Sequence, residues 1–329
     1  MIAILLAVVV VVAALAAGIY YYLPSGQQKK EYRVGMLLTT TPLDGGYTYA
    51  GYNGLMELRD TMNVNVSYVE YVSAADAERL MRAYADKGYD MVIAHGFAFE
   101  TSILKVAPDY PKTAFVWSGG KNMSGTNVAT IVSTLHESSY LAGMVAAGIS
   151  KTGIISYQSG SKTGGTAASF NAYVLGAKKV NANITVLENW IGVMADVQKG
   201  KEGAKALIAA GSDVCMSMGD GQSRGSIEGC QEAGKYAIGS IVDQNVLAPN
   251  TVVTSVVYYY GPIYIAIWKD VMAGNFKSQI FTWGLSTNCT GIAPYHGLAG
   301  NVSTSVQLQV NQTIADIKSG AFAVPNITA

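Results

Sequence analysis

The chain has 329 residues, of which 50% are apolar and 13% are charged, whereas an ordinary soluble protein carries roughly 25% charged residues. This length is more than one hydrophobic core usually serves, so we expect two lobes, and the apolar content excludes a disordered chain. Lys plus Arg and Asp plus Glu each number 22, so no net positive charge is available to attract nucleic acid. Three cysteines and three histidines disfavour a disulfide scaffold and a multi-histidine metal site.

The first 23 residues form an apolar run, and no charge appears before Lys29. At about 1.5 Å per residue, a helix of this length can cross a hydrocarbon core about 30 Å thick. We therefore expect an anchor helix over residues 1–23 and a stalk over residues 24–31. A cleaved signal peptide, processed near Ala14–Ala16, is the alternative. A helix that is apolar on all sides also suits the core of a filament.

Two signals bear on location, and they conflict. Lys29, Lys30 and Arg33 follow the apolar run, which by the positive-inside rule favours a cytoplasmic fold. Seven Asn-x-Ser/Thr sequons instead indicate an exported, glycosylated surface, unless they only reflect how common these residues are in exposed loops. The sequons begin at Asn65, Asn122, Asn183, Asn288, Asn301, Asn311 and Asn326. An apolar N-terminal segment without preceding basic residues is also typical of mature archaeal pilin-like proteins. We expect the extracellular face of the membrane or an extracellular filament.

From Tyr32 onward, short apolar segments alternate with helical patterns. Runs such as Met91–Ala94 and Ala114–Trp117 suit strands that are buried on both faces of a parallel sheet. Segments such as Asp76–Lys87 and Lys199–Ala210 carry their apolar residues on one helical face. The alternation predicts right-handed crossovers in a doubly wound α/β fold, and the number of strands favours two sheets.

In doubly wound sheets, ligands bind beyond the carboxyl ends of the strands, where loops lead into helices. The candidate loops are Thr39–Tyr49, His95–Phe97, Ser118–Gly120, Gly219–Gly221 and Asp243–Gln244.

At these loops the chain resembles the basic membrane protein family of ABC-transporter substrate-binding proteins, which includes purine nucleoside receptors. The matching motifs, in order, are Asp44–Thr48 with Gly54–Leu55, Gly88–Asp90, Gly96–Phe97, Ala107–Pro111, Glu137–Gly143, Trp190 with Asp196, Gly211–Asp213, Val242–Gln244 and Ile317–Gly320 with Val324–Pro325. No single motif is specific, but the ordered set spans Val34 to Pro325.

The resemblance implies a type I periplasmic-binding-protein clamshell, in which three crossing strands join two Rossmann-like lobes. Mapped onto this chain, lobe one covers residues 32–134 and 255–276, lobe two covers 135–254 and 277–301, and a C-terminal helix and tail cover 302–329. The crossings then fall near Ser133, Thr254 and Lys277.

The resemblance also implies a ligand site. Asp44 and Asp243 match acids that recognise the base and the ribose, and carboxylates suit this role because they accept paired hydrogen bonds. Tyr47 matches an aromatic residue that can stack on a planar base. Thr48 replaces the usual Asn, and Tyr258 stands where nucleoside-binding members commonly carry Lys.

Other candidates have an equally simple structural explanation. His95 ends a strand and is either a ligand contact or a hydrogen-bonded structural histidine. Phe97 is a stacking platform or a core residue, and Asp196 is a ligand residue or a helix cap. Gly219 opens a turn that can hold an anion at a helix N-terminus, although the turn lacks the P-loop pattern. Cys215 and Cys230 lie on a strand and the helix after it, and their pairing stays open.

The expected function is that of a solute receptor, which captures a nucleoside-like small molecule and delivers it to an ABC permease and ATPase. Hinge closure around the ligand would couple the two lobes. We expect no enzyme, no cofactor and no metal site, because the sequence shows no nucleophile with a base and no cluster of metal ligands. The alternative is a structural protein that self-assembles through residues 1–23 into a filament or surface lattice, with a retained or vestigial pair of lobes.

Overall fold

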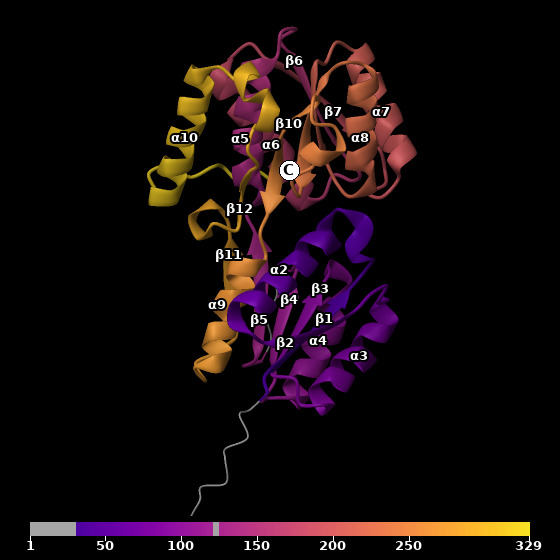
Figure 1. Cartoon of the computed structure of the whole chain (residues 1–329), viewed down its shortest axis with the longest axis vertical. Helices are drawn as coiled ribbons and strands as arrows, with labels where there is room; N and C mark the ends of the chain where they lie inside the picture. Colours follow the sequence, from indigo (N-terminus) through magenta and orange to yellow (C-terminus); the bar gives the residue numbers. More distant parts are fainter. Residues whose placement is uncertain (1–30, 121–124) are drawn as a thin grey trace, which may run out of the picture. The chain divides into compact units, whose positions relative to one another are not determined.

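The structure is a computed structural model that describes residues 31–120 and 125–329, and Arg33–Ala329 form one compact unit (Figure 1). The expected helix over residues 1–23 and the sequon at Asn122 lie outside the described residues. Within the described part of the chain, no helix is long and apolar enough to cross a membrane.

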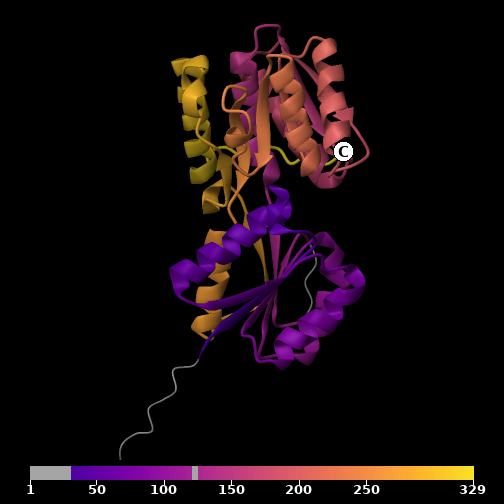
Figure 2. The ribbon, with the colours of Figure 1, turned by 45° about the vertical axis from the view of Figure 1, so that its right-hand side comes forward.

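The first lobe is built on a parallel six-stranded sheet of order β11-β5-β4-β3-β1-β2. Its strands are β1 (Arg33–Leu38), β2 (Asn65–Val69), β3 (Met91–His95), β4 (Ala114–Ser118), β5 (Val128–Ser133) and β11 (Gln279–Trp283). Its helices are α2 (Tyr47–Met62), α3 (Ala74–Asp86), α4 (Glu100–Val106) and α9 (Gly261–Met272). Figure 2 shows α2 and α9 on one face of this sheet and α3 and α4 on the other.

The second lobe repeats the design with a sheet of order β12-β10-β9-β8-β6-β7, in which only β12 runs antiparallel to its neighbour. Its strands are β6 (Ile154–Ser159), β7 (Thr185–Trp190), β8 (Val214–Met218), β9 (Tyr236–Ile241), β10 (Val252–Tyr258) and β12 (Thr290–Ile292). Its helices are α5 (Leu135–Ile149), α6 (Gly164–Val180), α7 (Val197–Ala209), α8 (Gly221–Glu232) and α10 (Thr304–Ser319). The two parallel-stranded lobes confirm the predicted α/β clamshell class.

The central strands form because their side chains are buried on both faces. All residues of β3, β4, β8 and β10 are buried, as the continuous apolar runs predict. The outer strands β2 and β7 consist of exposed and half-buried residues instead. Short 3-10 turns follow several strands: η1 (Pro42–Asp44), η2 (Phe97–Phe99), η3 (Ala107–Asp109), η4 (Asn245–Leu247), η5 (Leu285–Thr287) and η6 (His296–Asn301).

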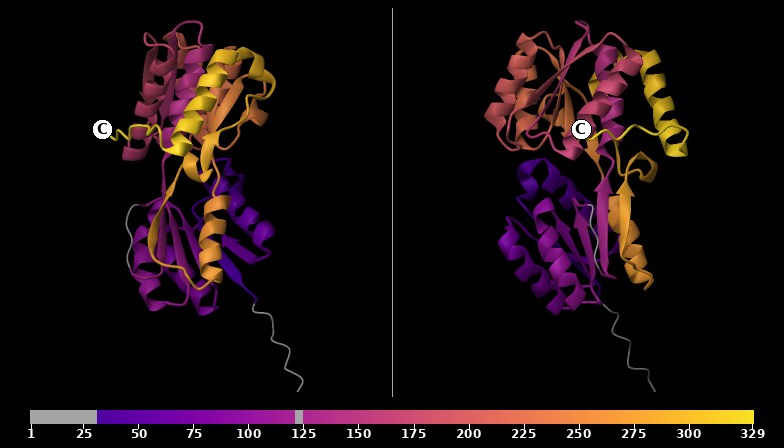
Figure 3. Two further views of the ribbon diagram at one scale, coloured as in Figure 1. Left: turned by 90° about the vertical axis from the view of Figure 1, so that its left-hand side faces the viewer. Right: turned by 180° about the vertical axis from the view of Figure 1, so that it is seen from behind.

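The chain passes between the sheets three times, after β5, after β10 and after β11 (Figure 3). The first crossing follows β5, which ends at Ser133. The second and third crossings were expected too early, near Thr254 and Lys277. The expected division at Thr254 cut through one buried strand, because β10 pairs with β9 and β12 along its whole length. Residues 279–283 belong to the first sheet instead of the second, because β11 pairs with β5.

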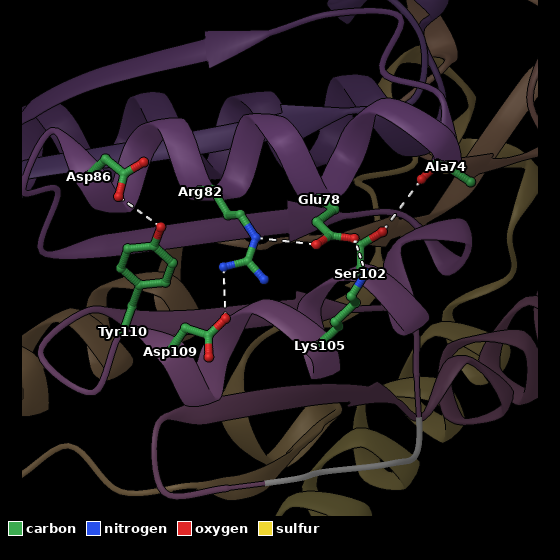
Figure 4. Close-up of polar contacts among 8 residues, drawn as sticks. All are labelled: Ala74, Glu78, Arg82, Asp86, Ser102, Lys105, Asp109 and Tyr110. Carbon is green, nitrogen blue, oxygen red and sulfur yellow. Dashed lines mark hydrogen bonds and ion pairs between the residues drawn. The ribbon is translucent and has the colours of Figure 1, made fainter.

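The motif Ala107–Pro111 supports the fold, and Figure 4 shows Asp109 and Tyr110 of this motif in contact with residues of α3. Arg82 of α3 binds Asp109 at 2.7 Å and Glu78 at 3.2 Å, and the phenol of Tyr110 donates to Asp86 at 2.7 Å. Lys105 of α4 contacts Glu78 at 2.8 Å. These contacts tie η3 and α4 to α3.

Candidate ligand site

An aromatic cluster lies at the carboxyl edge of the first sheet, beside the point where the strand order reverses around β1. His95 ends β3, and the ring of Tyr47, the first residue of α2, stacks on it with centroids 4.2 Å apart and planes 20° apart. Phe97 follows at 5.8 Å from Tyr47 and 24° from parallel, and its side chain is 68% exposed. The ring of Tyr260 meets His95 edge-on at 4.7 Å. Phe97 is thus the exposed ring of the cluster, whereas Tyr47 is half-buried and His95 and Tyr260 are buried.

Hydrogen bonds fix Tyr47 from both ends. The Nε2 of His95 lies 2.9 Å from the carbonyl oxygen of Tyr47, so Nε2 carries the proton and donates it. The Nδ1 of His95 lies 3.0 Å from the hydroxyl of Tyr264, which also lies 3.2 Å from the Oγ of Ser118. The hydroxyl of Tyr47 donates to the carbonyl oxygen of Ser118 at 3.0 Å. The Nε2 of the buried His95 therefore holds the backbone of Tyr47, while its Nδ1 is occupied by Tyr264.

Burial raises the pKa of four phenols in this region. It is the main cause for Tyr47, Tyr258, Tyr260 and Tyr264, each of which has a pKa above the ordinary value of a tyrosine. The hydroxyls therefore stay uncharged at neutral pH and can donate as well as accept hydrogen bonds.

One carboxylate of the second lobe reaches the first lobe. Asp220 follows β8, and its Oδ1 accepts a hydrogen bond from the backbone N–H of Tyr47 at 3.1 Å. The residue before Tyr47 is Gly46, and any Cβ there would collide with the carboxylate of Asp220. The glycine therefore provides the space that this contact between the lobes needs.

A cavity of about 260 Å³ is lined by residues of both lobes, among them Tyr260, whose ring lies edge-on to that of Tyr47. Its lining consists of Tyr49, Ala50, Asn53, Gly54, Glu57, Val242, Asp243, Val257, Tyr258, Tyr259, Tyr260 and Gly261. The lining carries two carboxylates and no lysine or arginine. Within the described residues, no group of three or more His, Cys, Asp or Glu side chains could hold a metal ion. The cavity can therefore take a small molecule that is rich in hydrogen-bond donors.

Asp243 lies at the rim of this cavity. Its Oδ2 is 2.7 Å from the Nε2 of His296, and its Oδ1 accepts from the backbone N–H of Asn245 at 3.1 Å. Its side chain is 37% exposed. Each carboxylate oxygen can accept a second hydrogen bond, so Asp243 retains the capacity to bind hydroxyl groups.

The remaining predicted residues are not part of the cavity lining. Thr48 is buried, with its Oγ1 2.7 Å from that of Thr40. Asp196 caps α7, because its Oδ1 accepts from the N–H of Lys199 at 2.9 Å. Gly219 is buried at the end of β8, and its N–H donates to the Oγ of Ser240 at 3.3 Å. Asp44 ends η1.

The sequence patterns do not single out Asp220, Tyr260 and Glu57 as site residues. They predict that the turn Gly219–Gly221 can hold an anion, whereas the structure places the carboxylate of Asp220 itself against α2. A weak signal for Tyr260 was present in the three consecutive tyrosines Tyr258–Tyr260. No local pattern in the sequence marks Glu57. It lines the cavity together with Tyr260 and Gly261, which lie where the chain passes from β10 to α9.

Comparisons with known proteins agree with this geometry. Residues 32–324 match the family model described as "ABC transporter substrate-binding protein PnrA-like". The chain is 30% identical over 295 residues to a purine-binding protein of Brucella abortus, covering 89% of this chain and 82% of that protein. It is 26% identical over 250 residues to a putative ABC transporter glucose-binding protein of Haloferax volcanii, covering 76% of this chain and 62% of that protein.

Among solved structures, an ABC transporter solute-binding protein of Conexibacter woesei matches with a TM-score of 0.79 at 21% identity. The match covers 90% of this chain and 99% of that one. The order of sheets and crossings seen here is thus shared with a solute-binding protein. Since the family model spans both lobes, the chain belongs to the PnrA-like family of ABC transporter substrate-binding proteins.

Proposed function

We propose that this protein captures a purine nucleoside or a related small molecule outside the cell and delivers it to the permease and ATPase of an ABC importer. The observation that carries the proposal is the cavity between the lobes, with Asp243 and Tyr258 from the second lobe facing Glu57 from the first. A ligand that contacts both lobes stabilises their closed arrangement, which is the signal that such a receptor passes to its transporter.

The chemistry of the lining favours a nucleoside over a free base. The carboxylates of Asp243 and Glu57 can accept hydrogen bonds from paired hydroxyls, and the exposed ring of Phe97 offers a stacking face. The proposed site extends from the cavity to Asp44, Tyr47, Thr48, His95 and Gly219 at the facing edges of the two sheets. The purine-binding relative supports this choice of ligand, and the glucose-binding relative makes a sugar the natural competitor.

The test is isothermal titration calorimetry with adenosine, adenine and D-glucose on the wild type and on Asp243→Asn. Loss of one acceptor leaves a ribose hydroxyl unpaired, so adenosine should bind about tenfold more weakly while adenine binds as before, in line with about 1–3 kcal/mol for a lost partner. Asp196→Asn is the control, since Asp196 caps α7, and its affinity for adenosine should match that of the wild type.

Two results would contradict the proposal. Equal losses for adenosine and adenine in Asp243→Asn would show that Asp243 does not recognise the ribose. Binding of D-glucose with no binding of either purine would identify a sugar receptor.

We further propose that residues 1–23 anchor the protein and that its surface is glycosylated. The six sequon asparagines in the described residues, Asn65, Asn183, Asn288, Asn301, Asn311 and Asn326, are all exposed. Intact-mass spectrometry of protein from the native host should show glycan mass that falls when sequons are changed to Gln. Deleting residues 1–23 should move the protein from the membrane fraction to the medium. Filaments seen by electron microscopy would instead favour self-assembly through this segment.

A further inference from the structure

Asp220 binds the start of α2 although it is not the residue that precedes this helix in the chain. The cap position of α2 is Gly46, which has no side chain, and the first turn of α2 contains no acidic residue. The carboxylate at this helix start comes from the other lobe, 173 residues along the chain, through the 3.1 Å bond from the N–H of Tyr47 to Asp220.

The start of α2 would otherwise attract an anion. A helix N-terminus carries unpaired N–H groups and a partial positive charge, and phosphate groups bind there readily. α2 is 16 residues long and begins after the loop that follows β1, at the carboxyl end of the first sheet, where ligands of doubly wound folds bind.

We propose that Asp220 is a specificity residue that occupies this anion position and so excludes phosphorylated ligands from the closed cleft. The inference rests on the proposed function, since it assumes a nucleoside-like ligand. A phosphate directed at the start of α2 would displace Asp220 or lie against its charge. The neighbouring cavity adds Glu57 and Asp243, with no lysine or arginine in its lining. Because these carboxylates would repel a phosphate group, the closed arrangement selects ligands without an anionic group.

Asp220 could instead act only as a latch that holds the lobes together. Removal of the negative charge from Asp220 distinguishes the two roles. Asp220→Asn keeps an oxygen that can accept from Tyr47 but removes the negative charge, whereas Asp220→Ala removes both. Exclusion of anions depends on the charge, while a latch depends mainly on the hydrogen bond.

The first experiment compares adenosine with adenosine 5′-monophosphate by calorimetry. For the wild type we expect binding of adenosine and at least about a hundredfold weaker binding of the monophosphate. In Asp220→Asn, affinity for the monophosphate should rise at least about tenfold while that for adenosine changes less than about threefold. The assignment would be overturned if the ratio of the two affinities were the same in both variants as in the wild type and Asp220→Ala lost affinity equally for both ligands. Asp220 would then act only as a latch.

The second experiment needs no nucleoside, so it separates failure of this inference from failure of the proposed function. Inorganic phosphate should raise the melting temperature of Asp220→Ala and leave that of the wild type unchanged. Asp196→Ala is the matched control, because it exposes the start of α7 within one lobe, away from the cavity lining. An equal response in Asp196→Ala and Asp220→Ala, or no response in Asp220→Ala, would overturn the proposal.

Discussion

Two aspartates of the second lobe precede helices, and their neighbours give them different roles. Asp196 caps its own helix through Lys199, whereas Asp220 binds Tyr47 of the other lobe. The sequence predicted a cap or a ligand role for Asp196, since the pattern of an acid before a helix fits both. It could not predict the role of Asp220, because the partner lies 173 residues away and no periodicity reports such a contact.

Asp196→Ala should lower the free energy of unfolding by about 1 kcal/mol, the usual effect of losing a side-chain cap. The affinity for the ligand should not change, because Asp196 does not line the cavity. Urea denaturation measures the first quantity and calorimetry the second. A loss of affinity without a loss of stability would show that Asp196 binds the ligand and does not act as a helix cap.

His136 of α5 gives a pH dependence to stability. The side chain is 7% exposed, and burial lowers its pKa below 6.5, with Glu137 and the backbone of Val324 partly opposing this. Between the lowered pKa and 6.5, the unfolded chain binds a proton that the folded chain does not, so stability falls as the pH drops through this window. Below the lowered pKa the loss is complete.

Replacement of His136 by Gln should remove this contribution. The unfolding free energies of the wild type and of His136→Gln are measured in urea at several pH values from 7.5 to about 5. The value for the wild type should fall relative to that of the variant as the pH drops. A difference that is constant over this range would show that His136 does not titrate differently in the folded and unfolded states.

At the scale of elements, glycines set how closely the helices of the second lobe approach. In α5, a Cβ on Gly143 would collide with the carbonyl oxygen of Tyr173 in α6, and a Cβ on Gly176 would collide with that of Tyr140 in α5. The pair is reciprocal: each helix presents a glycine to the backbone of the other. A similar relation joins α7 and α8.

Gly143→Ala should therefore destabilise the protein by about 1–3 kcal/mol, as overpacking usually does, although alanine is the better helix former. Gly165→Ala, near the start of α6 in open space, is the control and should leave stability equal or slightly higher. Thermal and urea denaturation measure both. Equal stabilities of the two variants would mean that the helices separate at little cost.

Apolar patterns predicted many of these elements. The run Met91–Ala94 appears as β3, and the amphipathic segment Asp76–Lys87 appears as α3. The pattern did not reveal β11, because this edge strand is largely exposed and has no continuous apolar run. It also did not reveal the glycine contacts, since packing between helices depends on which faces meet and not on periodicity alone.

At the scale of the whole folded unit, the contact that Asp220 makes with the first lobe leaves room only for a glycine at position 46. Gly46→Ala should disfavour the closed arrangement, because the added methyl group would collide with the carboxylate. Ligand affinity should then fall about tenfold, which corresponds to about 1.4 kcal/mol. Small-angle scattering of the ligand-free variant should give a larger radius of gyration than the wild type.

Gly297→Ala is the control, since a Cβ there meets nothing within 4 Å. Its scattering curve and its affinity should match those of the wild type. An unchanged radius of gyration and affinity in Gly46→Ala would show that the two lobes close without this contact.

The three crossings have a consequence for synthesis on the ribosome. The first five strands of the first sheet have been translated once β5 is complete. The sixth strand, β11, follows only after about 145 further residues. At roughly 5–20 residues per second, the nascent first lobe therefore waits about 7–30 s with the edge of β5 unpaired. During that interval the edge is a template for pairing with another chain. We infer that export or chaperone binding must protect the unfinished sheet until β11 emerges.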